Sequence, residues 1–132
     1  MKRFLAIILF LVSLLALTGC NRISIRDDGN AILRYSGVWF GDKGEYTQTL
    51  TEEETRKVKD YLTSAKYDPG VGGCPFDERV SITFADQVFA IAGDGCTTIW
   101  IVGTDKYYTI SKEGRKYIAS LFEKYCGYCR FA

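Results

Sequence analysis

The chain has 132 residues, of which 47% are hydrophobic and 14% aromatic, and this length and composition suit one globular domain. Its 17 basic and 16 acidic residues give a net charge of +1, which provides neither the basic surface typical of nucleic-acid-binding proteins nor an acidic tail. The sequence contains no histidine, which argues against Ser-His-Asp and Cys-His catalytic arrangements and against zinc sites built on histidine.

The first twenty residues have the layout of a secretion signal. Lys2 and Arg3 form a short cationic start, residues 4–17 are almost entirely apolar, and two small residues precede Cys20. The apolar run is too short for a transmembrane helix, which needs about 20 apolar residues. The ending Leu-Thr-Gly-Cys resembles the lipobox of bacterial lipoproteins, and the resemblance is confined to this segment. It implies cleavage before Cys20, lipidation of the Cys20 thiol and anchoring of the mature chain to a membrane.

The same resemblance sets the expected organisation and location. Residues 1–19 form the signal peptide, residues 20–30 a polar lipidated tether, and residues 31–132 a single domain. In Gram-negative lipoproteins an aspartate after the lipidated cysteine commonly retains the protein in the inner membrane. Asn21 stands at that place here, which implies the periplasmic side of the outer membrane, whereas a Gram-positive source implies the cell surface.

A β-hairpin and a helix are predicted at the start of the domain. Residues 31–40 are rich in β-branched and aromatic side chains, residues 41–44 are typical of a hairpin turn, and residues 45–49 return as a second strand. Thr51 followed by Glu54 has the pattern of a capping box, which begins a helix. The apolar face of this helix follows the helical period and consists of Val58, Tyr61, Leu62 and Ala65.

Four short strands and a second helix follow a loop at residues 68–75. From Arg79 the apolar residues alternate with polar ones, and turns separate four strand-like segments that end near residue 110. Ser111 is placed to cap a helix that extends to Tyr125. The predicted fold class is α+β in the order β-β-α-β-β-β-β-α, an antiparallel sheet with two helices packed on one face and stabilised by disulfides.

Four cysteines remain once Cys20 is lipidated, and an exported chain with an even number of thiols usually pairs them. Three pairings are possible. The predicted strand order places Cys74 and Cys96 beside the same edge of the sheet, and the last helix carries Cys126 and Cys129 to the opposite end. We therefore predict the disulfides Cys74–Cys96 and Cys126–Cys129.

The Cys-Gly-Tyr-Cys sequence at residues 126–129 resembles the redox motif of periplasmic disulfide isomerases. In that thioredoxin-like family the motif opens a helix, whose positive end stabilises the thiolate. Here the motif follows a predicted helix, and no βαβ unit surrounds it. A structural or labile disulfide is therefore favoured over redox catalysis and over a zinc site made of four cysteines.

The remaining polar patterns do not predict a ligand site. Gly70–Gly73 lacks the Lys-Ser/Thr ending of a phosphate-binding loop. Asp27, Asp28 and Asp42 lack the alternating spacing of a calcium loop. The sequence therefore predicts neither a cofactor nor a metal.

Aromatic residues near the first hairpin and in the last strands suit the core, but they also form a candidate binding surface. These residues are Trp39, Phe40, Tyr46, Trp100 and Tyr107. Because histidine and nucleophile motifs are lacking, the sequence favours a non-enzymatic, lipid-anchored envelope protein that binds another macromolecule as an inhibitor or accessory subunit. Its expected partners are the membrane and an envelope protein, not nucleic acid. Two alternatives stay open: a thiol–disulfide redox protein that uses Cys126 and Cys129, and a structural envelope component.

Overall fold

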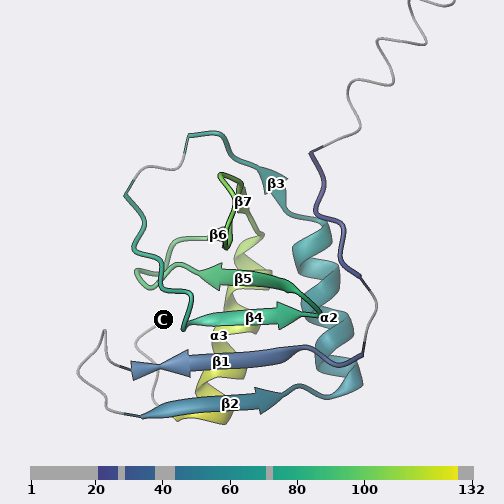
Figure 1. Ribbon diagram of the computed structural model, residues 1–132, viewed down its shortest axis with the longest axis vertical. Coiled ribbons are helices and arrows are strands. Elements are labelled where there is room, and N and C mark those ends of the chain that lie inside the picture. The colour runs from purple at the N-terminus through teal and green to yellow at the C-terminus, as the bar shows by residue number, and fades with distance from the viewer. Residues whose placement is uncertain (1–20, 27–28, 38–43, 71–72, 128–132) are drawn as a thin grey trace, which may run out of the picture.

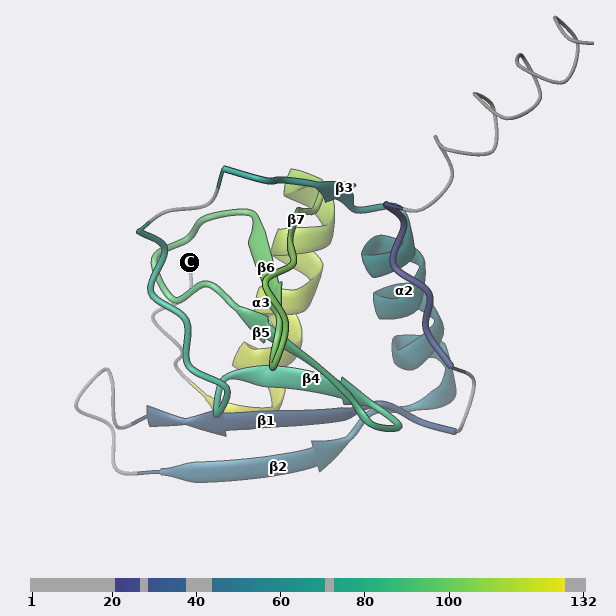
Figure 2. The same ribbon diagram turned by 45° about the horizontal axis from the view of Figure 1, so that its top comes forward.

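The computed structural model describes residues 21–26, 29–37, 44–70 and 73–127, which form an α+β fold of seven strands and two helices (Figure 1). In chain order the elements are β1 (Ile32–Ser36), β2 (Glu45–Thr49), α2 (Glu52–Thr63), β3 (Lys66–Tyr67), β4 (Ser81–Phe84), β5 (Gln87–Ile91), β6 (Thr98–Ile101), β7 (Tyr107–Thr109) and α3 (Lys112–Cys126). The predicted fold class is confirmed: all the strands are joined in one antiparallel sheet, and the two helices cover one face of it (Figure 2).

The strands lie in the order β2-β1-β4-β5-β6-β7-β3. Strands β4 to β7 are neighbours in both sequence and space, so the predicted run of four antiparallel strands is confirmed. Strand β1 pairs with β2 on one side and with β4 on the other, and helix α2 lies in the connection that leads from the hairpin to the rest of the sheet. The first hairpin thereby becomes one end of a single sheet.

The two-residue strand β3 is not among the six strands predicted from the sequence. Lys66 and Tyr67 pair with Thr109 and Tyr108 of β7 and extend the sheet at its far edge. Two residues are too short to show an alternating pattern, so only the pairing with β7 defines this strand. Strand β1 ends at Ser36, and residues 38–40 of the longer predicted strand lie outside the described residues.

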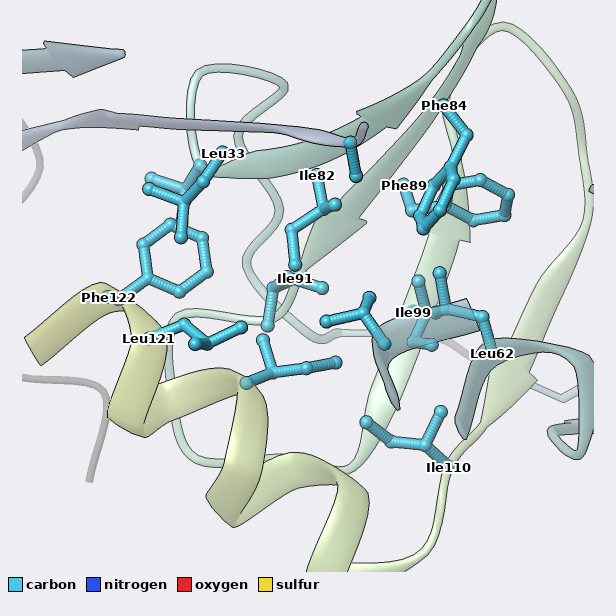
Figure 3. Packing of buried hydrophobic residues seen from close by; sticks show 14 of the residues in the cluster. Leu33, Leu62, Ile82, Phe84, Phe89, Ile91, Ile99, Ile110, Leu121 and Phe122 are labelled. Carbon is cyan, nitrogen blue, oxygen red and sulfur yellow. The ribbon is translucent and has the colours of Figure 1, made fainter. Parts of the chain in front are cut away.

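The core lies between the sheet and the two helices. Leu33, Ile82 and Phe89 are paired across three neighbouring strands, so they point to the same face, and all three are fully buried. Figure 3 shows Phe122 of α3 directed toward Leu33 and Leu121 directed toward Ile91. Each such side chain contributes about 1.5–3 kcal/mol when it is removed from water, so this packing accounts for most of the favourable free energy of folding.

The beginning of α2 and the end of α3 meet in a polar junction. Thr51 caps α2, and its hydroxyl accepts the backbone N–H of Glu54 while the Glu54 carboxylate accepts the backbone N–H of Thr51, which confirms the capping box. The same carboxylate accepts hydrogen bonds from Lys124 Nζ at 2.7 Å and from the Tyr125 hydroxyl at 2.9 Å. This junction, formed by Thr51, Glu54, Lys124 and Tyr125, joins the two helices.

The described part of the expected tether packs against the domain. Ile23 is 5% exposed and belongs to the core, and the backbone carbonyl of Ser24 accepts a hydrogen bond from Gln87. Arg26 forms an exposed ion pair with Asp86. Because this segment is mostly polar, its sequence did not indicate that Ile23 is buried. Among the residues that the structure describes, neither helix combines the length and the apolarity that a membrane span requires.

Candidate functional site

Two thiols and a carboxylate meet at one corner of the sheet. Asp94 and Cys96 lie in the connection between β5 and β6, and Cys74 lies in the segment that leads into β4. The sulfur atoms of Cys74 and Cys96 and a carboxylate oxygen of Asp94 all lie within 4.8 Å of one another. The prediction that Cys74 and Cys96 lie together is therefore confirmed at the level of position.

The two sulfurs are not bonded to each other, so the expected stabilisation by a disulfide is absent from this structure. Both residues are present as thiols, and Cys74 Sγ lies 4.0 Å from the hydroxyl of Thr98. Strand order and turn positions indicated which cysteines are neighbours. They did not determine the oxidation state, which depends on the redox conditions around the protein as well as on geometry.

A tight turn places Asp94 and Cys96 side by side. The Asp94 carboxylate accepts the backbone N–H of Cys96 at 3.1 Å, and Gly95 between them has a φ of +80°, a conformation that glycine adopts without steric cost. The turn is therefore encoded locally by the sequence Asp-Gly-Cys. Its geometry explains why the carboxylate lies next to the thiol.

Arg115 of α3 fixes the position of this turn through hydrogen bonds to its backbone. The residue is only 6% exposed, and its guanidinium donates to the backbone carbonyls of Cys96 at 3.0 Å and of Ala92 at 3.1 Å. Burial lowers the pKa of Arg115, while the nearby Asp94 carboxylate favours the charged form. A guanidinium suits this position because it can donate several hydrogen bonds in fixed directions.

The carboxylate and the thiol shift each other's pKa. The hydrogen bond to Asp94, and then the contact with Cys74 and burial, raise the pKa of Cys96 to about 12. The hydrogen bond from the Cys96 thiol lowers the pKa of Asp94. At neutral pH Cys96 therefore keeps its proton, and it is not poised as a nucleophile. The cluster has the groups needed to form a disulfide, and thiolate and carboxylate are also ligand types that zinc accepts.

Residues 73–80, which we call the strap, connect this corner to β4 along the side of the sheet (Figure 1). The Pro75 carbonyl accepts the backbone N–H of Gly93 at 3.1 Å, and the Val80 carbonyl accepts that of Ile91 at 3.0 Å. Between these points, Asp77 and Arg79 form an ion pair at 2.7 Å. The strap is thus fixed to the sheet at its two ends.

Phe76 of the strap packs against two aromatic residues of the sheet. Trp100 and Tyr107 are paired across β6 and β7, and their rings lie 6.4 Å apart at an interplanar angle of 20°. The Phe76 ring lies 6.2 Å from Trp100 and 5.7 Å from Tyr107. All three side chains are half-buried. We call Phe76, Trp100 and Tyr107 the aromatic cluster.

The aromatic cluster lies on the sheet face that points away from the helices. Ile99 and Tyr108 belong to the core, and Trp100 and Tyr107 follow or precede them by one residue, so they point to the opposite face. Phe76 was not identified from the sequence. It lies in an irregular segment, and no periodic pattern connects it with strands that begin more than twenty residues later.

The described residues of the predicted binding surface do not all lie on the same part of the molecule. Tyr46 lies on β2, at the other end of the sheet from β6 and β7, and its ring contacts Tyr35 at 6.1 Å on the helix-covered face. Tyr46 therefore does not share a surface with Trp100 and Tyr107. Trp39 and Phe40, which were predicted to belong to the same surface, lie outside the described residues.

The remaining cysteines are only partly placed. Cys126 is the last residue of α3 and is 5% exposed, so the Cys-Gly-Tyr-Cys sequence does begin at the end of a helix, as predicted. Cys129 and the predicted lipidation site Cys20 lie outside the described residues. The pairing of Cys126 with Cys129 stays a prediction.

Comparisons with protein-family models, with curated proteins and with solved structures gave no match.

Proposed function

We propose that this protein is a lipid-anchored, non-enzymatic component of a bacterial envelope that binds another envelope protein through Trp100 and Tyr107 of the aromatic cluster. The observation that carries the proposal is the gathering of Phe76, Trp100 and Tyr107 on the face of the sheet that the helices leave uncovered. Tryptophan and tyrosine are the residues most enriched among those that dominate binding energy at protein interfaces.

The location rests on the sequence of the first twenty residues. The Leu-Thr-Gly-Cys ending supports lipidation at Cys20, and Asn21 supports the outer membrane in a Gram-negative source. Anchoring by lipid raises the local concentration of a binding domain near other membrane proteins, so even a small interface is effective there.

The lipid anchor is tested by replacing the cysteine that would carry it. In the Cys20→Ala variant we expect no incorporation of a fatty-acid analogue, and we expect exported protein to leave the membrane fraction. The wild-type chain, labelled in parallel, is the positive control. Unchanged membrane retention of Cys20→Ala, without label, would contradict the anchor.

The binding surface is tested by comparing two aromatic substitutions. We expect Trp100→Ala to abolish co-purification of the partner with the full-length protein from detergent-solubilised native membranes. The matched control is Tyr46→Ala, which removes a tyrosine that is 38% exposed on the other end of the sheet and should keep the partner. Circular dichroism establishes that both variants are folded. Equal retention of the partner by both variants would exclude the aromatic cluster as the binding surface.

A further inference from the structure

We propose that Cys74 and Cys96 form a redox lock that fixes the strap, residues 73–80, over the outer sheet face and thereby controls access to Trp100 and Tyr107. The inference that Trp100 and Tyr107 bind a partner once they are exposed rests on the proposed function. The lock itself rests on three features of the structure: the position of the two sulfurs, the few points that hold the strap, and the residues that the strap covers.

The first feature is the position of the sulfurs at the start of the strap. Cys74 is the second residue of the strap, whereas Cys96 belongs to the turn between β5 and β6 that Arg115 holds in place. A bond between the two sulfurs would therefore join a movable segment to a fixed one. Because the two sulfurs are already neighbours, the bond requires only a small approach of one side chain to the other.

The second feature is that few backbone hydrogen bonds hold the strap before Val80, which is itself buried in the core and fixes the C-terminal end of the strap. It contains no helix or strand, and Gly73 at its beginning has a φ of +102°, a conformation suited to glycine. Its backbone hydrogen bonds to the sheet, among those described, run from Gly93 to Pro75 and from Ile91 to Val80. Segments with so few backbone bonds to the rest of the domain open at low free-energy cost.

The third feature is what lies beneath the strap. Ala90 is paired with Trp100 and points away from the helices, yet it is fully buried. This face of the sheet is therefore covered at Ala90, and next to it Phe76 of the strap packs directly on Trp100 and Tyr107. Opening of the strap would remove Phe76 and leave the other two rings exposed to solvent and to a partner.

The chemical step is a thiol–disulfide exchange with a disulfide oxidant, such as oxidised glutathione or an oxidised envelope oxidoreductase. The hydrogen bond to Asp94 keeps Cys96 protonated, so Cys74 reacts first: it loses its proton, its sulfur attacks one sulfur of the oxidant to form a mixed disulfide, and the released thiolate takes up a proton. The Cys96 thiol then gives its proton to the Asp94 carboxylate, to which it is hydrogen-bonded, as its sulfur attacks Cys74 Sγ of the mixed disulfide; the second thiolate departs and takes that proton from Asp94. One disulfide and two protein thiols thus become one protein disulfide and two small thiols.

The experiment uses full-length protein in detergent in which Trp39→Phe leaves Trp100 as the only tryptophan. Cys20→Ala, Cys126→Ala and Cys129→Ala in the same background leave Cys74 and Cys96 as the two cysteines of the chain. The protein is equilibrated with oxidised glutathione or with dithiothreitol, and the excess reagent is removed. Acrylamide quenching of Trp100 fluorescence and the rate of tryptic cleavage after Arg79 are then measured.

In the oxidised protein we expect a mass loss of two hydrogens and slow cleavage after Arg79. Reduction should raise the quenching constant about twofold and the cleavage rate about tenfold, because the dithiol form opens the strap more often. The control variant Cys74→Ser/Cys96→Ser should behave like reduced protein in both conditions. These readouts do not involve the partner, so failure of the lock is distinguishable from failure of the proposed binding function.

Three results would overturn the lock. The first is a failure of oxidant to link Cys74 with Cys96, seen as unchanged mass and two titratable thiols. The second is formation of the disulfide with no change in quenching or cleavage. The third is stoichiometric Zn²⁺ binding by both thiols in protein isolated without reductant, because a thiolate–carboxylate metal site would then be the native state of this corner.

Discussion

Each end of helix α3 takes part in a network around a buried charged group, Glu54 of α2 at one end and Arg115 of α3 at the other, but the two networks are organised in different ways. At its C-terminal end, Lys124 and Tyr125 surround the Glu54 carboxylate, and the capping box supplies a further partner. At its N-terminal end, Arg115 donates to backbone carbonyls and supports a turn that presents a thiol and a carboxylate near the surface. The first end is a closed structural network, whereas the second holds groups that can still react.

This difference follows from what each charged group faces. A carboxylate surrounded by donors is stabilised in its charged form, and its site has no remaining chemistry. An arginine that donates to backbone carbonyls positions a turn and leaves the Cys96 thiol of that turn near the surface. The comparison indicates that burial of a charge by itself does not identify a functional site. The presence of unreacted thiols beside that charge is the distinguishing feature.

The strongest test of the network at the C-terminal end of α3 is removal of the Glu54 carboxylate. Glu54→Ala should lower the free energy of unfolding by about 3 kcal/mol, because it removes the Glu54 half of the capping box and leaves Lys124 and Tyr125 without their shared acceptor. The measurement is chemical denaturation at pH 7. The control is Glu53→Ala, which breaks only the exposed pair with Lys57 and should cost about 0.5 kcal/mol or less. Equal effects of the two substitutions would contradict the structural role of the junction.

The same carboxylate predicts an acid dependence of stability. Burial would raise the pKa of Glu54, but hydrogen bonds from Lys124, the Thr51 backbone and Tyr125 outweigh it and lower the pKa to about 2 from 4.5. Because the folded-state pKa is the lower one, this stabilisation is complete well above pH 4.5 and is lost as the pH falls toward 2. Between pH 5 and pH 3 we expect a loss of about 2 kcal/mol, measured by denaturation at each pH. The decline should be smaller by that amount in Glu54→Gln.

The other end of α3 is tested by removing the guanidinium. Arg115→Met should cost about 1.5 kcal/mol, because the carbonyls of Ala92 and Cys96 lose their donor while an apolar side chain still fills the space. Arg115→Lys should recover part of this loss, since an ammonium group can reach one carbonyl. Denaturation combined with the rate of Cys96 alkylation measures both the stability and the order of the turn. Unchanged alkylation in Arg115→Met would show that Arg115 does not position the thiol.

The smallest expected effect concerns the contact between the two helices. A Cβ at Gly114 would lie 2.8 Å from the Tyr61 ring, so Gly114→Ala should destabilise by about 1 kcal/mol although alanine is the better helix former. In a Tyr61→Ala background the same substitution should become stabilising by a few tenths of a kcal/mol. A double-mutant cycle measures this change of sign. Destabilisation of equal size in both backgrounds would indicate a local helix effect instead of a close approach.

Several features could be predicted from the sequence because they depend on neighbouring residues. The capping box at Thr51 and Glu54, the turn through Gly95 and the alternation that begins near Arg79 each lie within a few residues of chain. The vicinity of Cys74 and Cys96 also followed, because antiparallel strands joined by short turns leave little freedom in where their ends lie.

Other features were decided only by the tertiary structure, because they depend on contacts between distant segments. Strand β3 exists because β7 offers it backbone partners, and Ile23 is buried because the sheet provides a surface for it. Phe76 meets Trp100 and Tyr107 through the path of an irregular segment, and Arg115 reaches the turn at Cys96 through the packing of α3. Local patterns determined the two helices and six of the seven described strands in chain order, whereas the candidate site arose where nonlocal packing brought a strap, a turn and a helix together.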